Sequence, residues 1–281
     1  MNITSIIGTG LIGGSMALKL KEKGFTERVI GVDNNLENLA QAKDLGIIDD
    51  ALSLEEAIAI SDLIILAIPV DAVKKLLPKV LDLVTDFQTV MDVGSTKANL
   101  VHTIEQHKNR KRYVASHPMW GTENSGPSAA QHNAFTGKAA IICNPEDSAK
   151  DALELVKKVY ETLEMNLLFM DADAHDVHTA YISHISHITS YALANTVLEK
   201  EREEDKIFQL ASSGFSSTVR LAKSHPEMWV PIFRQNKENV LDVLNEHISQ
   251  LRKFKSALEK ENYEFLEELI VNANRIRGIL K

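Results

Sequence analysis

A glycine-rich turn near the start of the chain constrains the fold more than any other feature of the sequence. In "ITSIIGTGLIGG", Gly8, Gly10 and Gly13 come directly after an apolar run typical of a strand. This GxGxxG spacing, followed by a helix, is the signature of a dinucleotide-binding βαβ unit. A second strand-like run, "ERVIGVD", ends about twenty residues further on in Asp33. Strand, turn, helix and acidic residue together predict a Rossmann-type domain.

Each position of this turn has a physical reason to be there. Gly8 allows the tight turn, Gly10 lets the backbone approach a pyrophosphate, and Gly13 permits close packing of the helix. Leu11 and Ile12 lie at the start of that helix, where backbone N–H groups and the positive end of the helix dipole favour a phosphate. The turn is therefore expected to bind the diphosphate of a dinucleotide.

Asp33 and Pro69 extend this predicted cofactor site. The Asp33 carboxylate would accept hydrogen bonds from an adenosine ribose and would repel a 2′-phosphate, which favours NAD over NADP. Pro69 follows the apolar run "DLIILAI", at the carboxyl end of a strand. Ligands of such sheets bind at that edge.

The pattern of apolar residues divides the chain into two parts. From residue 1 to about 170, short β-branched runs alternate with helix-like stretches, the pattern of a mostly parallel α/β sheet. Over residues 171–281 apolar residues recur at spacings of three and four, which predicts an all-helical domain. This domain has more apolar positions than one layer can cover, which predicts a dimer; they include Phe208, Leu210, Trp229, Phe233 and Leu241.

Local signals predict where two helices begin. Ser53 and Glu56 have the spacing of a capping box, so a short helix should start there. Pro226 is typical of the first turn of a helix. Pro231, five residues later, should kink that helix or restart it.

Composition limits the partners and the compartment. The formal charge of −8 argues against a nucleic-acid partner, and the one basic cluster, "KNRKR", is expected to be a solvated turn. The single Cys143, in the strand-like "AAIIC", excludes an intrachain disulfide and suits a reducing compartment. No stretch reaches the roughly 18 apolar residues of a membrane span, and no signal peptide is evident. We therefore expect a cytoplasmic protein without a membrane partner.

Two polar segments follow predicted strands of the first part. Ser95 in "DVGSTK" is either a helix N-cap or a group beside the nicotinamide end of the crevice. His117 in "SHPMWG" ends the strand "RYVAS", before a proline that keeps its backbone extended. A histidine there is placed to exchange a proton with a hydroxyl that is being oxidised. On position alone, a structural role stays open for both residues.

The helical part contains a histidine cluster and a notable arginine. "HDVHTAYISHISH" holds His175, His178, His184 and His187, but no carboxylate or thiolate at ligand spacing completes a tetrahedral site. We expect no metal there, and instead substrate contact or buried hydrogen bonds. Arg220 follows a polar, glycine-containing loop and could clamp a carboxylate with two hydrogen bonds, although an ordinary surface arginine is the alternative.

Taken in order, five motifs resemble those of one family. "GTGLIGGS", "DVGSTK", "SHPMWGTENSG", "HD…SHISH" and "SSGFSSTVRLAKSHPEMW" look like the motifs of the prephenate and arogenate dehydrogenases of tyrosine biosynthesis, from residue 1 to about 275. The resemblance implies a Rossmann-type domain, a helical domain that forms a homodimer, and an active site between them. It implies NAD-dependent oxidative decarboxylation of prephenate to 4-hydroxyphenylpyruvate. Arogenate dehydrogenase, a hydroxy-acid dehydrogenase and a catalytically silent NAD-binding regulator remain the alternatives.

The resemblance also implies roles for individual residues. His117 and Ser95 would be the catalytic pair at the ring hydroxyl. The substrate would be bound by Arg220, His184, His187, Thr122 and Lys97, and the cofactor by Gly8, Gly10, Leu11, Ile12, Gly13, Asp33 and Pro69. The reaction needs no metal, because NAD takes the electrons and the aromatic product provides the driving force. Trp120 departs from the pattern, since family members often carry a small residue there.

Overall fold

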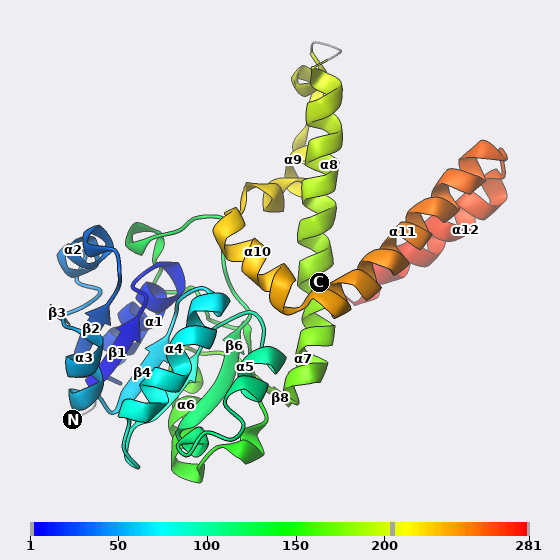
Figure 1. Ribbon diagram of the computed structural model, residues 1–281. Helices are drawn as coiled ribbons and strands as arrows, with labels where there is room; N and C mark the ends of the chain where they lie inside the picture. The colour runs from blue at the N-terminus through cyan, green and yellow to red at the C-terminus, as the bar shows by residue number, and fades with distance from the viewer. Residues whose placement is uncertain (1–2, 203–205, 280–281) are drawn as a thin grey trace. The chain divides into compact units, whose positions relative to one another are not determined.

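An eight-stranded sheet forms the centre of the first part of the chain (Figure 1). The computed structural model describes residues 3–202 and 206–279. All neighbouring strands run parallel except β6 and β7. The spatial order β3-β2-β1-β4-β5-β6-β7-β8 reverses direction between β1 and β4, the point at which ligands bind in doubly wound sheets. The strands are β1 (Ile3–Ile7), β2 (Arg28–Val32), β3 (Asp50–Ala51), β4 (Leu63–Leu66), β5 (Thr89–Asp92), β6 (Tyr113–Pro118), β7 (Ala139–Cys143) and β8 (Asn166–Met170).

Helices cover both faces of this sheet (Figure 1). One buried apolar cluster includes Met16 of α1 and Val156 of α6, and a second includes Leu77 of α4 and Leu100 of α5. The sheet therefore lies between two helical layers, as the α/β prediction requires. The helices of these layers are α1 (Leu11–Glu22), α2 (Leu36–Asp44), α3 (Leu54–Ile60), α4 (Val70–Leu83), α5 (Ala98–Thr103) and α6 (Lys150–Thr162).

The described chain after β8 forms helices joined by short turns and contains no strand. Two compact units result, Met1–Asn236 and Lys237–Lys281, so the first helices after residue 170 belong to the same unit as the sheet. None of the helices in residues 3–202 and 206–279 has both the length and the apolar character needed to cross a membrane. The helices are α7 (Ala172–Thr179), a π-helical turn (Ala180–His184), α8 (Ile185–Glu201), α9 (Ser213–Thr218), α10 (Pro226–Gln235), α11 (Lys237–Glu259) and α12 (Tyr263–Ala273).

Most of the predicted local structure is confirmed. Every β-branched run that predicted a strand forms one, whereas the two-residue β3 was not predicted because it is too short for a pattern. The Ser53 side chain accepts a hydrogen bond from the Glu56 N–H at 3.3 Å, and the Glu56 carboxylate accepts one from the Ser53 N–H at 3.1 Å. This is the predicted capping box at the start of α3. Cys143 is buried in β7, as expected.

The prediction of a solvated basic turn at residues 108–112 is wrong for two of its residues. Arg110 and Arg112 are 7% and 6% exposed. Their guanidinium groups lie 3.1 Å from a carboxylate oxygen of Asp147 and 2.8 Å from one of Asp151. Since these carboxylates are distant in sequence, the spacing of the basic residues could not reveal the pairing. The cluster joins β6 to the start of α6.

Helix α10 confirms the prediction for Pro226 and excludes a restart of the helix at Pro231. Pro226 occupies the first turn, where its missing N–H has no helical partner to lose. Pro231 lies inside the helix, which continues without a restart to Gln235. A proline this close to the N-terminus removes one backbone hydrogen bond, and the remaining bonds and the apolar face of α10 hold the helix.

The packing of α1 on β1 depends on the absence of a side chain at Gly13. A Cβ atom there would lie 2.2 Å from the Gly8 carbonyl oxygen and 2.7 Å from Cγ2 of Ile6. We expect Gly13→Ala to lower the free energy of unfolding by about 1–3 kcal/mol, because α1 must move away from the strand. Thermal unfolding followed by circular dichroism measures the loss.

Gly10→Ala is the matched control for this variant. A Cβ at Gly10 would meet only the Gly126 nitrogen, at 4.0 Å, so only the N-cap preference for glycine is lost. We expect a clearly smaller fall in Tm than for Gly13→Ala. Equal falls for the two variants would contradict the packing argument.

Candidate active site

The turn between β1 and α1 is shaped to receive an anion. Gly8 has φ +99°, in the left-handed region that favours glycine. Gly10 is the N-cap of α1, and among the described residues no side chain caps this helix. Because a Cβ at Gly10 would have free space, the approach to the first N–H groups of α1 is open. These features fit the pyrophosphate of a dinucleotide.

Asp33 lies beside this turn, at the carboxyl end of β2. One carboxylate oxygen accepts hydrogen bonds from the Thr9 N–H at 3.0 Å and the Thr9 hydroxyl at 3.2 Å, and the other accepts from the Asn35 N–H at 2.9 Å. The carboxylate is thereby oriented next to the glycines, where a ribose diol would follow the pyrophosphate. Pro69 is exposed at the same edge of the sheet, as the N-cap of α4.

A pocket adjoins the glycine turn. It has a volume of about 580 Å³ and is lined by residues 123–125 and 128–131 together with His225. One of its lining side chains, Ala130, would lie 3.0 Å from a Cβ at Gly14 of α1. The loop that forms the pocket also contains Thr122, whose hydroxyl accepts a hydrogen bond from the Asn124 N–H at 3.2 Å.

His117 is held near the end of β6 by a second histidine. Its Nδ1 lies 2.9 Å from Nε2 of His175, a residue of α7, and the two rings meet edge to face with centroids 5.1 Å apart. Burial lowers the pKa of His117 well below its ordinary value, and the nearby His175, Lys97 and His184 lower it further. His117 is therefore neutral near pH 7 and able to accept a hydrogen bond or a proton.

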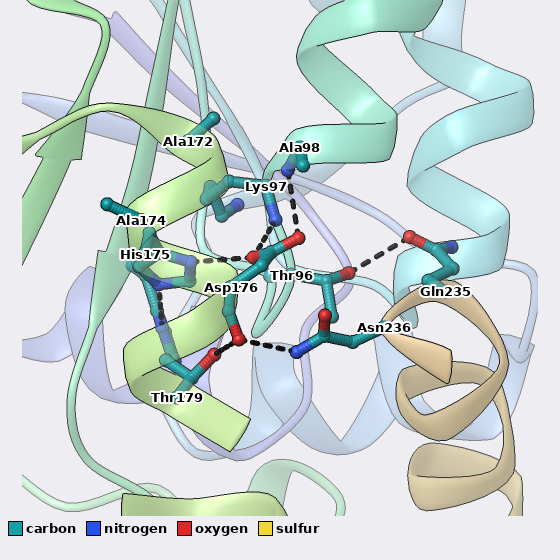
Figure 2. A network of polar contacts seen from close by, with 12 residues as sticks. Thr96, Lys97, Ala98, Ala172, Ala174, His175, Asp176, Thr179, Gln235 and Asn236 are labelled. Atoms are coloured by element: carbon teal, nitrogen blue, oxygen red, sulfur yellow. Dashed lines mark hydrogen bonds and ion pairs between the residues drawn. The ribbon is translucent and has the colours of Figure 1, made fainter. Parts of the chain in front are cut away.

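The buried carboxylate of Asp176 connects α7 to the segment after β5 (Figure 2). Its oxygens accept hydrogen bonds from the Lys97 N–H at 2.8 Å and the Ala98 N–H at 3.0 Å. One of these oxygens lies 2.8 Å from Nδ1 of His175, and the Asp176 carbonyl accepts from the Asn236 amide at 2.6 Å. This network places α7, with His175, against the loop that carries Ser95.

The structure corrects the substrate-binding role predicted for Lys97. Its side chain is 0% exposed, and its ammonium group pairs with the equally buried carboxylate of Asp92. A substrate could reach Lys97 only by breaking this ion pair in the interior, which is strongly unfavourable. Lys97 instead stabilises the turn between β5 and α5 through this buried ion pair.

Ser95 is half-buried in that turn. The N-cap of α5 is Lys97, so the alternative interpretation of Ser95 as a helix cap is wrong. The position after β5 leaves Ser95 at the carboxyl edge of the sheet, the edge that also carries the glycine turn. This placement is compatible with its predicted role beside His117.

The two histidines predicted to bind substrate differ in accessibility. His184 is 1% exposed, and burial lowers its pKa to about 4. The His187 ring is half-buried and stacks on Trp229 with centroids 3.4 Å apart, and its Nδ1 lies 3.0 Å from the Ser183 carbonyl oxygen. Burial also lowers the pKa of His187. A direct substrate contact therefore fits His187 and not His184, which packs beneath Trp229 with its ring 6.0 Å away.

Arg220 lies at the rim of the pocket. It begins a short 3-10 turn, and Nη1 is 3.5 Å from a carboxylate oxygen of the pocket residue Glu123. The Arg220 side chain is 55% exposed, so its guanidinium group remains accessible to a ligand carboxylate. Among the described residues, no three His, Cys, Asp or Glu side chains are grouped to hold a metal ion.

Sequence reasoning did not identify three residues that matter to this geometry. His175 and Asp176 appeared only as part of a histidine-rich segment, and Asp92 only as a strand end. His175 contacts a residue 58 positions away in the chain, and Asp176 contacts residues 78 and 79 positions away. The partner of Asp92 is 5 positions away. The adjacent pair "HD" was the one available signal, since a carboxylate beside a histidine often orients the ring.

Comparisons with known proteins agree with the fold. The family model "Prephenate dehydrogenase, nucleotide-binding domain" matches residues 16–168, and "Prephenate dehydrogenase, dimerization domain" matches residues 171–272. Over 264 residues the chain is 32% identical to the prephenate dehydrogenase of Bacillus subtilis (strain 168), covering 93% of this chain and 71% of that protein. Over 282 residues it is 27% identical to the cyclohexadienyl dehydrogenase of Zymomonas mobilis, covering 99% and 95%.

Two solved structures are similar over nearly the whole chain. One is the Aquifex aeolicus prephenate dehydrogenase in complex with hydroxyphenyl propionate and NAD+, with a TM-score of 0.92, 32% identity and coverage of 100% of this chain and 99% of that one. The other is the Synechocystis arogenate dehydrogenase, with a TM-score of 0.80, 25% identity and coverage of 99% and 100%. With a dinucleotide-binding turn, a neutral histidine at the sheet edge and both family models matched, the chain belongs to the prephenate dehydrogenase family.

Proposed function

We propose that the chain is an NAD-dependent prephenate dehydrogenase, which converts prephenate to 4-hydroxyphenylpyruvate and CO2. The observation that carries this proposal is His117, half-buried, with a lowered pKa, at the carboxyl edge of the sheet that also bears the glycine turn and Asp33. When bound by these residues, NAD supplies a hydride acceptor. The Aquifex aeolicus relative holds hydroxyphenyl propionate and NAD+, which supports both ligand classes.

The chemistry of the substrate explains why a neutral base is needed. Prephenate carries a ring hydroxyl opposite a quaternary carbon that bears a carboxylate. As hydride leaves the hydroxyl-bearing carbon, His117 accepts the hydroxyl proton, a contribution of about 10²- to 10⁴-fold in rate. The bond to the carboxylate then breaks, CO2 leaves, and the bonding electrons make the ring aromatic. The proton returns from His117 to the same oxygen, so the reaction releases no net proton.

Four other side chains complete the proposed site. Arg220 binds a substrate carboxylate, because its guanidinium group is exposed and, among the described residues, is paired with Glu123 alone, at 3.5 Å. His187 and Thr122 contact the substrate, and Ser95 orients the hydroxyl toward His117.

Arogenate is the second candidate substrate. It differs from prephenate by an amine in place of the side-chain ketone, and none of the residues proposed here selects between the two groups. The similarity to the Synechocystis arogenate dehydrogenase and to the Zymomonas mobilis cyclohexadienyl dehydrogenase favours testing it. Prephenate remains the primary proposal, because the Asp33 position indicates NAD and the NAD-using members of the family commonly take prephenate.

Partners and location follow from the same proposal. We propose a small acid as the only substrate and the cytoplasm as the site of action. The free, buried thiol of Cys143 suits a reducing compartment, and a formal charge of −8 disfavours nucleic acid.

The function is tested by comparing both substrates with both cofactors, for the wild type and Asp33→Ala. We expect NADH formation and CO2 release with prephenate and NAD. Asp33→Ala should raise the KM for NAD and narrow the preference over NADP, because the ribose acceptor and the repulsion of a 2′-phosphate are both lost. Formation of NADH without release of CO2 would indicate a hydroxy-acid dehydrogenase. Absence of NAD reduction with both prephenate and arogenate would indicate a protein that binds NAD without catalysis.

The role of His117 predicts a pH profile as well as a mutant phenotype. His117→Asn should lower kcat by about 10²-fold or more and leave the KM for NAD nearly unchanged. In the wild type the rate should fall at acid pH, as His117 becomes protonated and can no longer accept the hydroxyl proton. Because burial lowers the pKa of His117, the midpoint should lie below the ordinary histidine value of about 6.5.

Arg220→Gln provides the contrasting variant. It should raise the KM for the substrate with a smaller change in kcat, since a carboxylate clamp acts in the ground and transition states alike. If His117→Asn keeps near-normal kcat and the acid limb persists, another group is the base, and His187 would be the first candidate to test.

We further propose that the helical part forms a homodimer. Leu210 is 86% exposed, and Phe208 and Leu241 are 40% and 41% exposed. Trp229 does not contribute, because it is 6% exposed and packs against Val70 within the chain. The match of residues 171–272 to a dimerization-domain model supports a dimer formed by this part of the chain. Sedimentation equilibrium at micromolar concentration should give twice the chain mass of 31.2 kDa; a monomer would contradict the proposal.

A further inference from the structure

Two side chains, His175 and Asp176, form a continuous line of hydrogen bonds behind His117, the proposed base. Nδ1 of His117 lies 2.9 Å from Nε2 of His175, and Nδ1 of His175 lies 2.8 Å from a carboxylate oxygen of Asp176. His175 is 0% exposed and Asp176 is 2% exposed, so water does not compete for these contacts. The donors and acceptors along this line can therefore be assigned one after another, starting from the Asp176 carboxylate.

The donors around Asp176 fix the position of each proton in this line. Its carboxylate already accepts the N–H groups of Lys97 and Ala98, which are backbone donors and cannot titrate (Figure 2). An acceptor-only carboxylate requires His175 to carry its proton on Nδ1. With that single proton on His175, its Nε2 is an acceptor, and His117 then donates through its own Nδ1. The lone pair of His117 is left on Nε2.

We propose that His175 and Asp176 are positioning residues that hold His117 in the tautomer with an unprotonated Nε2. This inference rests on the proposed function, since only a proton acceptor needs that tautomer. Among the described residues, no hydrogen bond occupies Nε2 of His117, which leaves this atom for the substrate hydroxyl. When His117 takes up the proton, its Nδ1–H continues to donate to Nε2 of His175. The Asp176 carboxylate, on the far side of the His175 ring, stabilises the transient positive charge on His117.

The same contacts distinguish a positioning role from simple packing. A packing role needs only the volume of the His175 ring, whereas the proposed role needs an acceptor at the position of Nε2 and a donor toward Asp176. Glutamine offers both groups on one amide, while leucine fills much of the space and offers neither. His178 lies on the same helix, three residues on, and is exposed, which makes His178→Leu a matched control.

Steady-state kinetics with prephenate and NAD provide the first test. His175→Leu should lower kcat by about 10- to 100-fold with little change in either KM, as loss of a ring-orienting partner does elsewhere. His175→Gln should recover a large part of that loss, and His178→Leu should match the wild type. Wild-type kcat in His175→Leu would overturn the proposal, as would a His175→Gln variant that is folded but as slow as His175→Leu.

A measurement on the unmutated protein makes the test independent of folding and of turnover. Nitrogen-15 NMR of the histidine-labelled chain distinguishes the two neutral tautomers, and the His117 signals are assigned by their absence in His117→Asn. We expect Nδ1 protonated and Nε2 unprotonated at neutral pH. A His117 protonated on Nε2 would overturn the inference. Failure of the wild type to oxidise prephenate would instead count against the proposed function and leave the tautomer result standing.

Discussion

The carboxylate of Asp176 is the constraint on which the arrangement of the proposed site depends. It is buried, and an isolated buried charge would be strongly unfavourable. Its oxygens are compensated by the N–H groups of Lys97 and Ala98 and by the ring of His175, and its carbonyl accepts from Asn236. These partners come from the loop after β5, from α7 and from the end of α10. Satisfying this one charge thus holds the start of α5 against α7, and the Asp176 carbonyl adds the end of α10.

A second buried charge stabilises the same region from the sheet side. Asp92 pairs with the Lys97 ammonium and accepts hydrogen bonds from the Tyr113 hydroxyl at 2.6 Å and the Ser116 N–H at 3.3 Å. The Tyr160 hydroxyl donates to the Ser116 hydroxyl, which donates to the Asp92 carbonyl, each at 2.7 Å. Burial and the nearby Asp92 carboxylate raise the pKa of Tyr113, so its hydroxyl stays a donor. The network is fully paired, which is the condition under which buried polar groups rigidify a core.

The same burial that makes this region rigid also keeps its histidines neutral, and neutral histidines can act as bases. Burial lowers the pKa of His117, His184 and His187, and a neutral imidazole can accept a proton where an imidazolium cannot. Arg220, at the rim, is an accessible cation. A substrate with carboxylates at one end and a hydroxyl at the other would meet a permanent positive charge outside and a proton acceptor inside. That polarity matches the oxidation and decarboxylation proposed for the protein.

The sequence by itself determined the local features of the protein, and only the tertiary structure decided which polar groups meet. The turn at Gly8 to Gly13, the Ser53 cap and the sheet-to-helix change near residue 170 depend on neighbouring residues, so periodicity and spacing predicted them. The edge position of His117 followed from the same reasoning. The burial of Lys97 and the contact between His117 and His175 could not be predicted, because they arise where segments 58 residues or more apart in the chain pack together. Once such segments exclude water, each buried charge must find a partner among the groups that the packing brings near it.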